Sequence, residues 1–126
     1  MRNSRVLLVV LGLICFVGCL RRHRHGGYSE SISISDNRDV YKFTAKYNKH
    51  KTGKVRSYLK EALSPSELFE PGDNYINMHT TLTDNTELYI KSSAGQLQIK
   101  LDKDENSRSS YRRIKKVCEG LKEVLK

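Results

Sequence analysis

The sequence predicts a small α+β fold with a single domain, an antiparallel sheet with helices packed on one face, in the order β-β-α-β-β-β-α. The chain has 126 residues, of which 37% are hydrophobic and few are Pro or Gly, so it can bury one modest core. Several segments alternate apolar and polar residues, which is typical of half-buried strands. Others repeat apolar residues at helical spacing, and a sheet covered on one face buries both kinds of stripe.

The first two strands are expected to form a hairpin. Tyr28, Ile32 and Ile34 alternate with polar residues, mostly serines, and residues 36–39, Asp-Asn-Arg-Asp, supply the turn chemistry. The apolar positions of the second strand are Tyr41, Phe43, Ala45 and Tyr47.

Three more strands follow between residues 76 and 101. The apolar face of the first is expected to include Ile76, Met78, Thr80 and Leu82. The next two are marked by Leu88 and Ile90, and then by Leu97, Ile99 and Leu101. Turn residues separate them at positions 84–85 and 94–95.

Helical spacing predicts one helix over residues 53–63, with Thr52 as its cap. Ser64-Pro65-Ser66-Glu67 predicts a short second helical turn that ends at Pro71-Gly72. The final helix has an apolar stripe from Tyr111 to Leu125, and Asn106 or Ser107 is expected to cap it.

The N-terminus has the layout of an export signal. Arg2 and Arg5 precede an uncharged run from Val6 to Val17. The fifteen residues from Val6 to Leu20 would span about 22 Å as a helix, less than the roughly 30 Å of a bilayer core. We therefore interpret residues 1–18 as a signal peptide, with an uncleaved anchor or a plain secretory signal as alternatives.

The tetrapeptide Phe16-Val17-Gly18-Cys19 resembles the lipobox of bacterial lipoproteins, although Leu is more usual than Phe at its first position. The resemblance implies that Cys19 is acylated, for instance with palmitate, and anchors the protein in the cell envelope. Residues 19–27 would then be a lipidated, basic tether, and residues 28–126 the folded domain. Leu20 in the next position implies the outer rather than the inner membrane.

Three arginines, Arg21, Arg22 and Arg24, follow Cys19 and are expected to lie near the lipid headgroups. Of the three cysteines, Cys15 falls in the signal and Cys19 is the lipidation site, so the mature chain cannot form an internal disulfide. Cys118 lies on the apolar stripe of the final helix and is interpreted as a core residue.

No catalytic, metal or cofactor motif is found, so the sequence predicts a protein that is not an enzyme and binds no cofactor. Residues 102–113 begin like a calcium loop, but Ser107 replaces its glycine and Arg113 its last glutamate. His50 and His79 lack a catalytic pattern around them, and no glycine-rich phosphate loop is present. An enzyme or inhibitor whose site is built from scattered residues stays open as an alternative.

The composition is basic, with 23 Lys and Arg against 14 Asp and Glu and a formal net charge of +9. One interval without an acidic residue is expected to form a single patch that binds an anionic lipid or another envelope polyanion. The basic residues of this patch are Lys42, Lys46, Lys49, Lys51, Lys54, Arg56 and Lys60.

Nucleic acid is the second partner considered. The α-β-β-β-α order expected for residues 53–126 resembles the double-stranded RNA-binding domain, whose last helix presents a basic start to phosphates. Its Gly-Pro-x-His loop and Lys-Lys-x-Ala-Lys pattern are absent here. The leading interpretation is a small, membrane-anchored bacterial lipoprotein that serves as a non-enzymatic binding or envelope-assembly module with an unknown protein partner.

Overall fold

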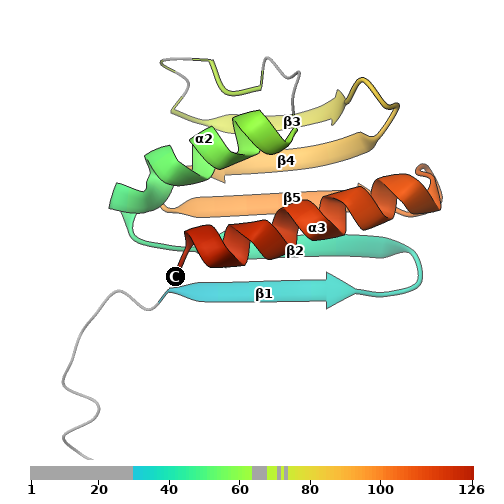
Figure 1. The fold of residues 1–126 in the computed structure, drawn as a ribbon, viewed down its shortest axis with the longest axis horizontal. Coiled ribbons are helices and arrows are strands. Elements are labelled where there is room, and N and C mark those ends of the chain that lie inside the picture. The colour runs from blue at the N-terminus through green and yellow to red at the C-terminus, as the bar shows by residue number, and fades with distance from the viewer. Residues whose placement is uncertain (1–29, 64–67, 71, 73) are drawn as a thin grey trace, which may run out of the picture.

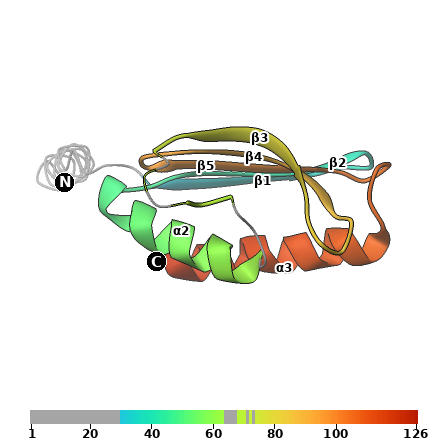
Figure 2. The same cartoon turned by 90° about the horizontal axis from the view of Figure 1, so that it is seen from above.

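A five-stranded antiparallel sheet carries two helices on one of its faces (Figures 1 and 2). The computed structural model describes residues 30–63, 68–70, 72 and 74–126. The elements are β1 (Ser31–Asp36), β2 (Val40–Lys46), a 3-10 turn η2 (Lys49–Lys51), α2 (Thr52–Ala62), β3 (Ile76–Thr81), β4 (Glu87–Ser93), β5 (Gln96–Asp102) and α3 (Arg108–Val124). The α+β class and the element order predicted from the sequence are therefore confirmed.

The strands lie in the order β1-β2-β5-β4-β3, and every neighbouring pair is antiparallel. The hairpin β1–β2 thus joins the meander β3-β4-β5 through the pairing of β2 with β5. The turn of the hairpin forms as its sequence predicts, because the side chain of Asn37 accepts hydrogen bonds from the backbone N–H groups of Asp39 and Val40 at 3.0 and 2.9 Å.

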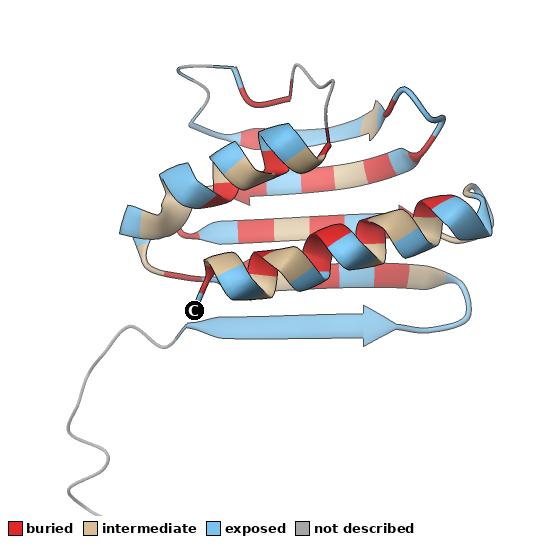
Figure 3. Ribbon diagram, viewed as in Figure 1, coloured by how far each residue is buried: buried red, intermediate tan, exposed pale blue. Residues whose placement is uncertain are grey.

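The core lies between the sheet and the helices (Figure 3). In the paired strands β2 and β5, Phe43 lies opposite Ile99 and Tyr41 opposite Leu101, and these four side chains are at most 1% exposed. Helix α3 covers them with its apolar stripe, and the rings of Tyr41 and Tyr111 meet edge to face at 5.9 Å. The buried residues of α3 are Ser110, Ile114, Val117, Cys118 and Leu121.

Three apolar side chains that the sequence places on half-buried strand faces are largely exposed. Ile32 and Ile34 of β1 are 41% and 40% exposed, and Met78 of β3 is 43% exposed. All three belong to edge strands, while α3 lies over β2 and β5 (Figure 1). Alternation predicts which face of the sheet a side chain points to. Whether that side chain is buried depends also on whether a helix extends far enough to cover its strand.

The two helix caps expected from the sequence have different outcomes. Ser107 caps α3, since its hydroxyl accepts a hydrogen bond from the N–H of Ser110 at 3.0 Å. Thr52 does not cap α2, whose N-cap is Lys51. The Thr52 hydroxyl instead accepts from the N–H of Gly95 at 3.1 Å and ties the start of α2 to the β4–β5 turn.

Some predictions fall on residues outside the described ranges. These are the signal peptide 1–18, Cys19, the tether 19–27 with its arginines, Tyr28, and the helical turn over residues 64–67 together with Pro71.

The end of β1 is held by a cluster of charged contacts around Asp36. Its carboxylate accepts hydrogen bonds from the Lys103 ammonium and the Tyr111 hydroxyl, each at 2.6 Å. These bonds, with the Lys103 one contributing most, hold the pKa of the Asp36 carboxyl below its usual range. Asp36 thereby links the hairpin to the loop after β5 and to the first turns of α3.

The substitution Asp36→Asn should lower the free energy of unfolding by about 1 kcal/mol at neutral pH, because a partly exposed charge-assisted contact is lost. The folded pKa of Asp36 is depressed, so its contribution is fully present above the unfolded pKa of about 3.9 and disappears as the pH falls through the folded pKa. Urea unfolding of both proteins at several pH values measures this difference. The matched control is Asp39→Asn in the same turn, which should change the free energy of unfolding little. If the loss of stability in Asp36→Asn did not become smaller in acid, the stabilising role of the Asp36 carboxylate would be contradicted.

Candidate functional site

In the part of the chain that the structure describes, both helices lie on one face of the sheet, and the opposite face carries neither of them (Figure 2). Because side chains alternate along a strand, the residues opposite the core all point to this side. We call it the open face. Its members are Ser31, Ser33, Ser35, Val40, Lys42, Thr44, Lys46, Asn77, His79, Thr81, Glu87, Tyr89, Lys91, Ser93, Gln96, Gln98, Lys100 and Asp102.

An aromatic pair lies on the open face where β3 meets β4. His79 and Tyr89 are directly opposite each other, and their ring centroids are 5.0 Å apart with the planes tilted by 48°. The Tyr89 hydroxyl donates to the Asn77 side chain at 2.8 Å, and the Asn77 amide donates to the Tyr75 hydroxyl at 3.1 Å. These bonds orient the Tyr89 ring beside His79 on the open face.

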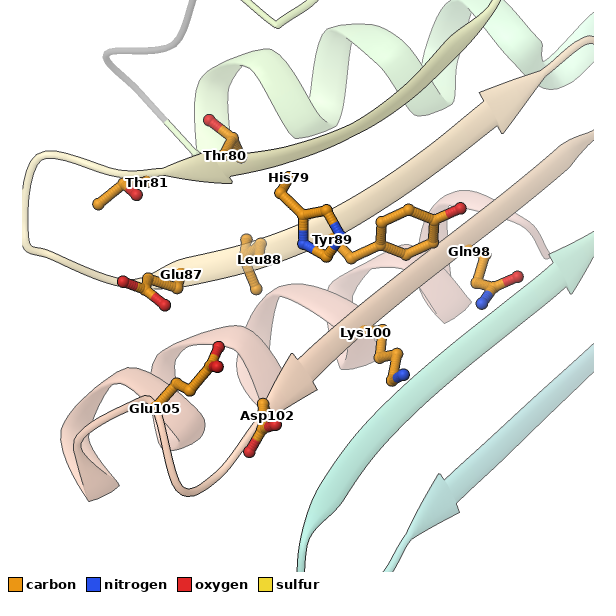
Figure 4. Close-up of a pocket in the computed structure, with 10 residues that line it drawn as sticks. All are labelled: His79, Thr80, Thr81, Glu87, Leu88, Tyr89, Gln98, Lys100, Asp102 and Glu105. Carbon is orange, nitrogen blue, oxygen red and sulfur yellow. The ribbon is translucent and has the colours of Figure 1, made fainter.

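The open face is hollowed beside this pair, and the hollow has a volume of about 600 Å³ (Figure 4). Gln98 and Lys100 line one side of it, and three carboxylates line the other, Glu87, Asp102 and Glu105. The charge of Asp102, followed by that of Glu87, raises the pKa of the Glu105 carboxyl. The hollow is therefore acidic toward the loop after β5 and basic toward β2.

Four exposed lysines lie on the open face, Lys42, Lys46, Lys91 and Lys100, and Lys100 also lines the hollow. Lys42 and Lys100 are directly opposite each other across β2 and β5, a pairing of like charges that destabilises a sheet when nothing neutralises it. Within the described part of the chain, none of the four forms an ion pair, whereas Lys51, Lys103 and Lys115 all do. The lysine charge on the open face is thus available to an anion from outside.

The single basic patch expected from the sequence is not formed, because its members are divided over the molecule. Lys42 and Lys46 lie on the open face, whereas Lys54, Arg56 and Lys60 lie on α2, in the layer on the other side of the sheet (Figure 2). Lys49 and Lys51 belong to the η2 turn between these layers. Lys51 contacts Glu30 at 2.9 Å and the carbonyl of Leu125 at 2.9 Å, so its charge stabilises contacts between distant segments of the fold.

Sequence reasoning missed Lys91 and Lys100, which join Lys42 and Lys46 on the open face. The available signal was strand alternation, since both lysines occupy polar positions between buried residues of β4 and β5. Alternation alone could not bring them next to Lys42, because that requires the pairing of β2 (Val40–Lys46) with β5 (Gln96–Asp102), two strands far apart in the sequence.

Cys118, His50 and His79 do not assemble into a catalytic group in the described part of the chain. Cys118 is buried, and burial raises the pKa of its thiol to about 12. His50 is exposed in the η2 turn, away from the hollow. His79 lines the hollow, but its ring lies against Tyr89 and forms no hydrogen bond to a carboxylate of the described residues.

The acidic side of the hollow does not form a metal site. Over residues 30–63, 68–70, 72 and 74–126, no group of three or more His, Cys, Asp or Glu side chains is arranged to hold a metal ion. The residues that resemble a calcium loop close a turn instead: Asp102 accepts from the N–H of Asp104 at 2.9 Å, and Asn106 accepts from the N–H of Glu87 at 2.8 Å.

Comparison with known proteins found no match to this chain among protein-family models, curated proteins or solved structures. No helix in the part of the chain that the structure describes is long and apolar enough to cross a membrane.

The raised pKa and burial of Cys118 predict an unreactive thiol. In a chain with Cys15 and Cys19 replaced by serine, iodoacetamide should label Cys118 at least about 100-fold more slowly in the folded state than in concentrated urea at mildly alkaline pH, because the thiolate is rare and covered. Mass spectrometry of timed samples measures both rates. Equal rates in the two states would show that the thiol is accessible, and would contradict the assignment of Cys118 to the core.

Proposed function

We propose that this protein is a membrane-tethered, non-enzymatic binding module whose open face takes an anionic partner, either anionic lipid or an envelope polyanion. The observation that carries the proposal is the set of four exposed lysines, without ion pairs among the described residues, beside the His79–Tyr89 pair. A cationic surface of this kind raises the local concentration of an acidic partner and speeds its encounter.

The arrangement of the lysines favours an extended partner over a small molecule. Lys42, Lys100 and Lys91 come from the adjacent strands β2, β5 and β4. Neighbouring strands are about 4.8 Å apart, so these charges extend over roughly 10 Å of a flat sheet. A bilayer surface or a charged polymer can meet several of them at once, whereas a small anion would engage one or two.

The N-terminal sequence supports the tether. Five of the 23 basic residues and none of the 14 acidic residues precede residue 30, so residues 30–126 carry a formal net charge of +4 out of +9. Arg21, Arg22 and Arg24 follow the lipobox-like Cys19, where each can contribute on the order of 1 kcal/mol of attraction to an anionic leaflet. One acyl chain with a basic segment is sufficient for stable anchoring.

The open face is tested by vesicle binding of residues 28–126, which lack the tether. The triple variant Lys42→Gln, Lys91→Gln, Lys100→Gln should bind vesicles containing phosphatidylglycerol at least about 10-fold more weakly than the unmodified domain, since each lysine near the surface contributes about 1 kcal/mol. Co-sedimentation at low salt measures the affinity, and added salt should weaken it by screening.

The matched control removes the same charge from outside the open face, with Lys49→Gln in the η2 turn and Lys54→Gln and Lys60→Gln in α2. All six lysines are exposed, so neither variant should lose its fold, as circular dichroism can verify. Equal loss of binding in both variants would mean that only net charge matters. No loss in either variant would remove the open face from membrane binding, and an anionic glycan would be the next probe.

The tether is tested by metabolic labelling with palmitate. The full chain expressed in a bacterial host should incorporate label and partition with membranes, and Cys19→Ser should abolish both, because acylation requires the Cys19 thiol. Cys15→Ser is the matched control and should keep its label. Label that persists in Cys19→Ser, or a mature protein that begins elsewhere than Cys19, would contradict the lipoprotein interpretation.

Duplex RNA is the second candidate partner. The described elements do follow the order α2-β3-β4-β5-α3, with both helices on one face, and Arg108 and Arg112 are exposed at the start of α3. Binding of duplex RNA that is lost in Arg108→Gln, Arg112→Gln but kept in the open-face variant would favour this candidate, because the RNA would then contact the start of α3 rather than the open face.

A further inference from the structure

β1 is the outermost strand on one side of the described sheet, and it lacks three devices that commonly protect such an edge: a lysine, a proline and a bulge. Its sequence, Ser-Ile-Ser-Ile-Ser-Asp, contains no lysine and no proline, and it pairs with β2 in continuous register from Ser31 to Asp36 without a bulge. An edge strand presents a row of unpaired backbone N–H and C=O groups, and proteins commonly blunt such edges with those devices. All six residues of β1 are exposed, including both isoleucines.

The five residues from Ser31 to Ser35 read the same in both directions, and this symmetry identifies the partner. We propose that two copies of this chain pair through β1, antiparallel and in register about a two-fold axis at Ser33. A two-fold contact requires a surface that is complementary to itself. A palindromic strand meets this requirement, because each isoleucine then lies opposite an isoleucine and each serine opposite a serine.

The register follows from the positions of the side chains. With Ser33 opposite Ser33 of the second copy, Ile32 lies opposite Ile34, and Ser31 lies opposite Ser35. Ile32 and Ile34 pair with Ala45 and Phe43 of β2, so they are on the helix side of the sheet. The four isoleucines of a dimer would therefore cluster on that side and cover apolar surface that is about 40% exposed in the single chain.

The charges at the two ends of β1 are compatible with this register. It places Glu30 opposite Asp36 of the second copy, which would be unfavourable for bare carboxylates. Glu30 is paired with Lys51 at 2.9 Å, and Asp36 with Lys103 at 2.6 Å. If the two-fold axis lay at Ile32, Ile34 would be opposite Glu30 of the second copy, and if it lay at Ile34, Ile32 would be opposite Asp36. The register centred on Ser33 is therefore favoured.

Disulfide trapping tests the register in the full chain, with Cys15 and Cys19 replaced by serine and the protein held in a mild detergent. Ser33→Cys should cross-link to itself, because opposite residues in an antiparallel pair have Cα atoms about 4.5 to 5.5 Å apart, within disulfide range. Ser31→Cys is the matched control on the same face of the same strand. Two copies of it would be about 13 Å apart, four residues along the strand.

We expect Ser33→Cys to form dimers at least about 10-fold faster than Ser31→Cys, and a mixture of Ser31→Cys with Ser35→Cys to form the mixed dimer. Adding Ile34→Lys to Ser33→Cys should abolish the cross-link while the fold is kept, since the Ile34 side chain is 40% exposed. Equal rates for Ser33→Cys and Ser31→Cys would indicate random collision in the micelle and overturn the proposal. A folded Ser33→Cys protein that stays monomeric under oxidation would also overturn the proposal. That result is expected if the edge of β1 is free, or if it pairs with a different strand.

Discussion

Helix α3 packs its apolar stripe onto the inner faces of β2 and β5, and the other features of the molecule depend on that contact. The stripe meets the fully buried row of Tyr41 and Phe43, while the Tyr58 hydroxyl of α2 donates to the carbonyl of Val117 at 2.9 Å and holds the two helices together. Gly120 makes this approach possible, because a Cβ at that position would collide with the Tyr58 ring. Among the described residues, both helices lie on one face of the sheet, and neither helix lies over the open face or over the outer strand β1 (Figures 1 and 2).

The described basic side chains have two different roles. Lys51, Lys103 and Arg113 bind carboxylates of distant segments and close the ends of the sheet onto the helices. Such contacts at the surface contribute modestly to stability, but they fix where the loops lie. Lys42 and Lys100 are placed where no described carboxylate pairs with them, and their direct opposition costs stability in the isolated domain. An anionic partner would remove that cost, and this difference between the two groups of basic residues is the physical basis for proposing that the open face binds one.

Pairing through β1 would leave the open face intact and double its extent. An axis perpendicular to the sheet keeps the same face of both copies on the same side, so the two open faces would become one continuous surface. Weak contacts from each copy with a bilayer or a polymer would then act together, which raises apparent affinity without any new contact. The serines of β1 would lie at the centre of this surface, where their small side chains leave room for a flat partner.

The sequence by itself determined the identity and order of the elements, because the apolar periods of two and of 3.6 residues are local properties that burial on one face requires. It also determined the turn at Asn37 and limited the cap of α3 to Asn106 or Ser107, because in both places a side chain bonds the backbone within three residues. The tertiary structure alone decided that Ile32, Ile34 and Met78 stay exposed, that Thr52 bonds Gly95 instead of capping α2, and that Lys42 meets Lys100 rather than Lys54. These outcomes depend on strand register and on which strands a helix covers. Contacts between residues tens of positions apart set both, and no local pattern encodes them.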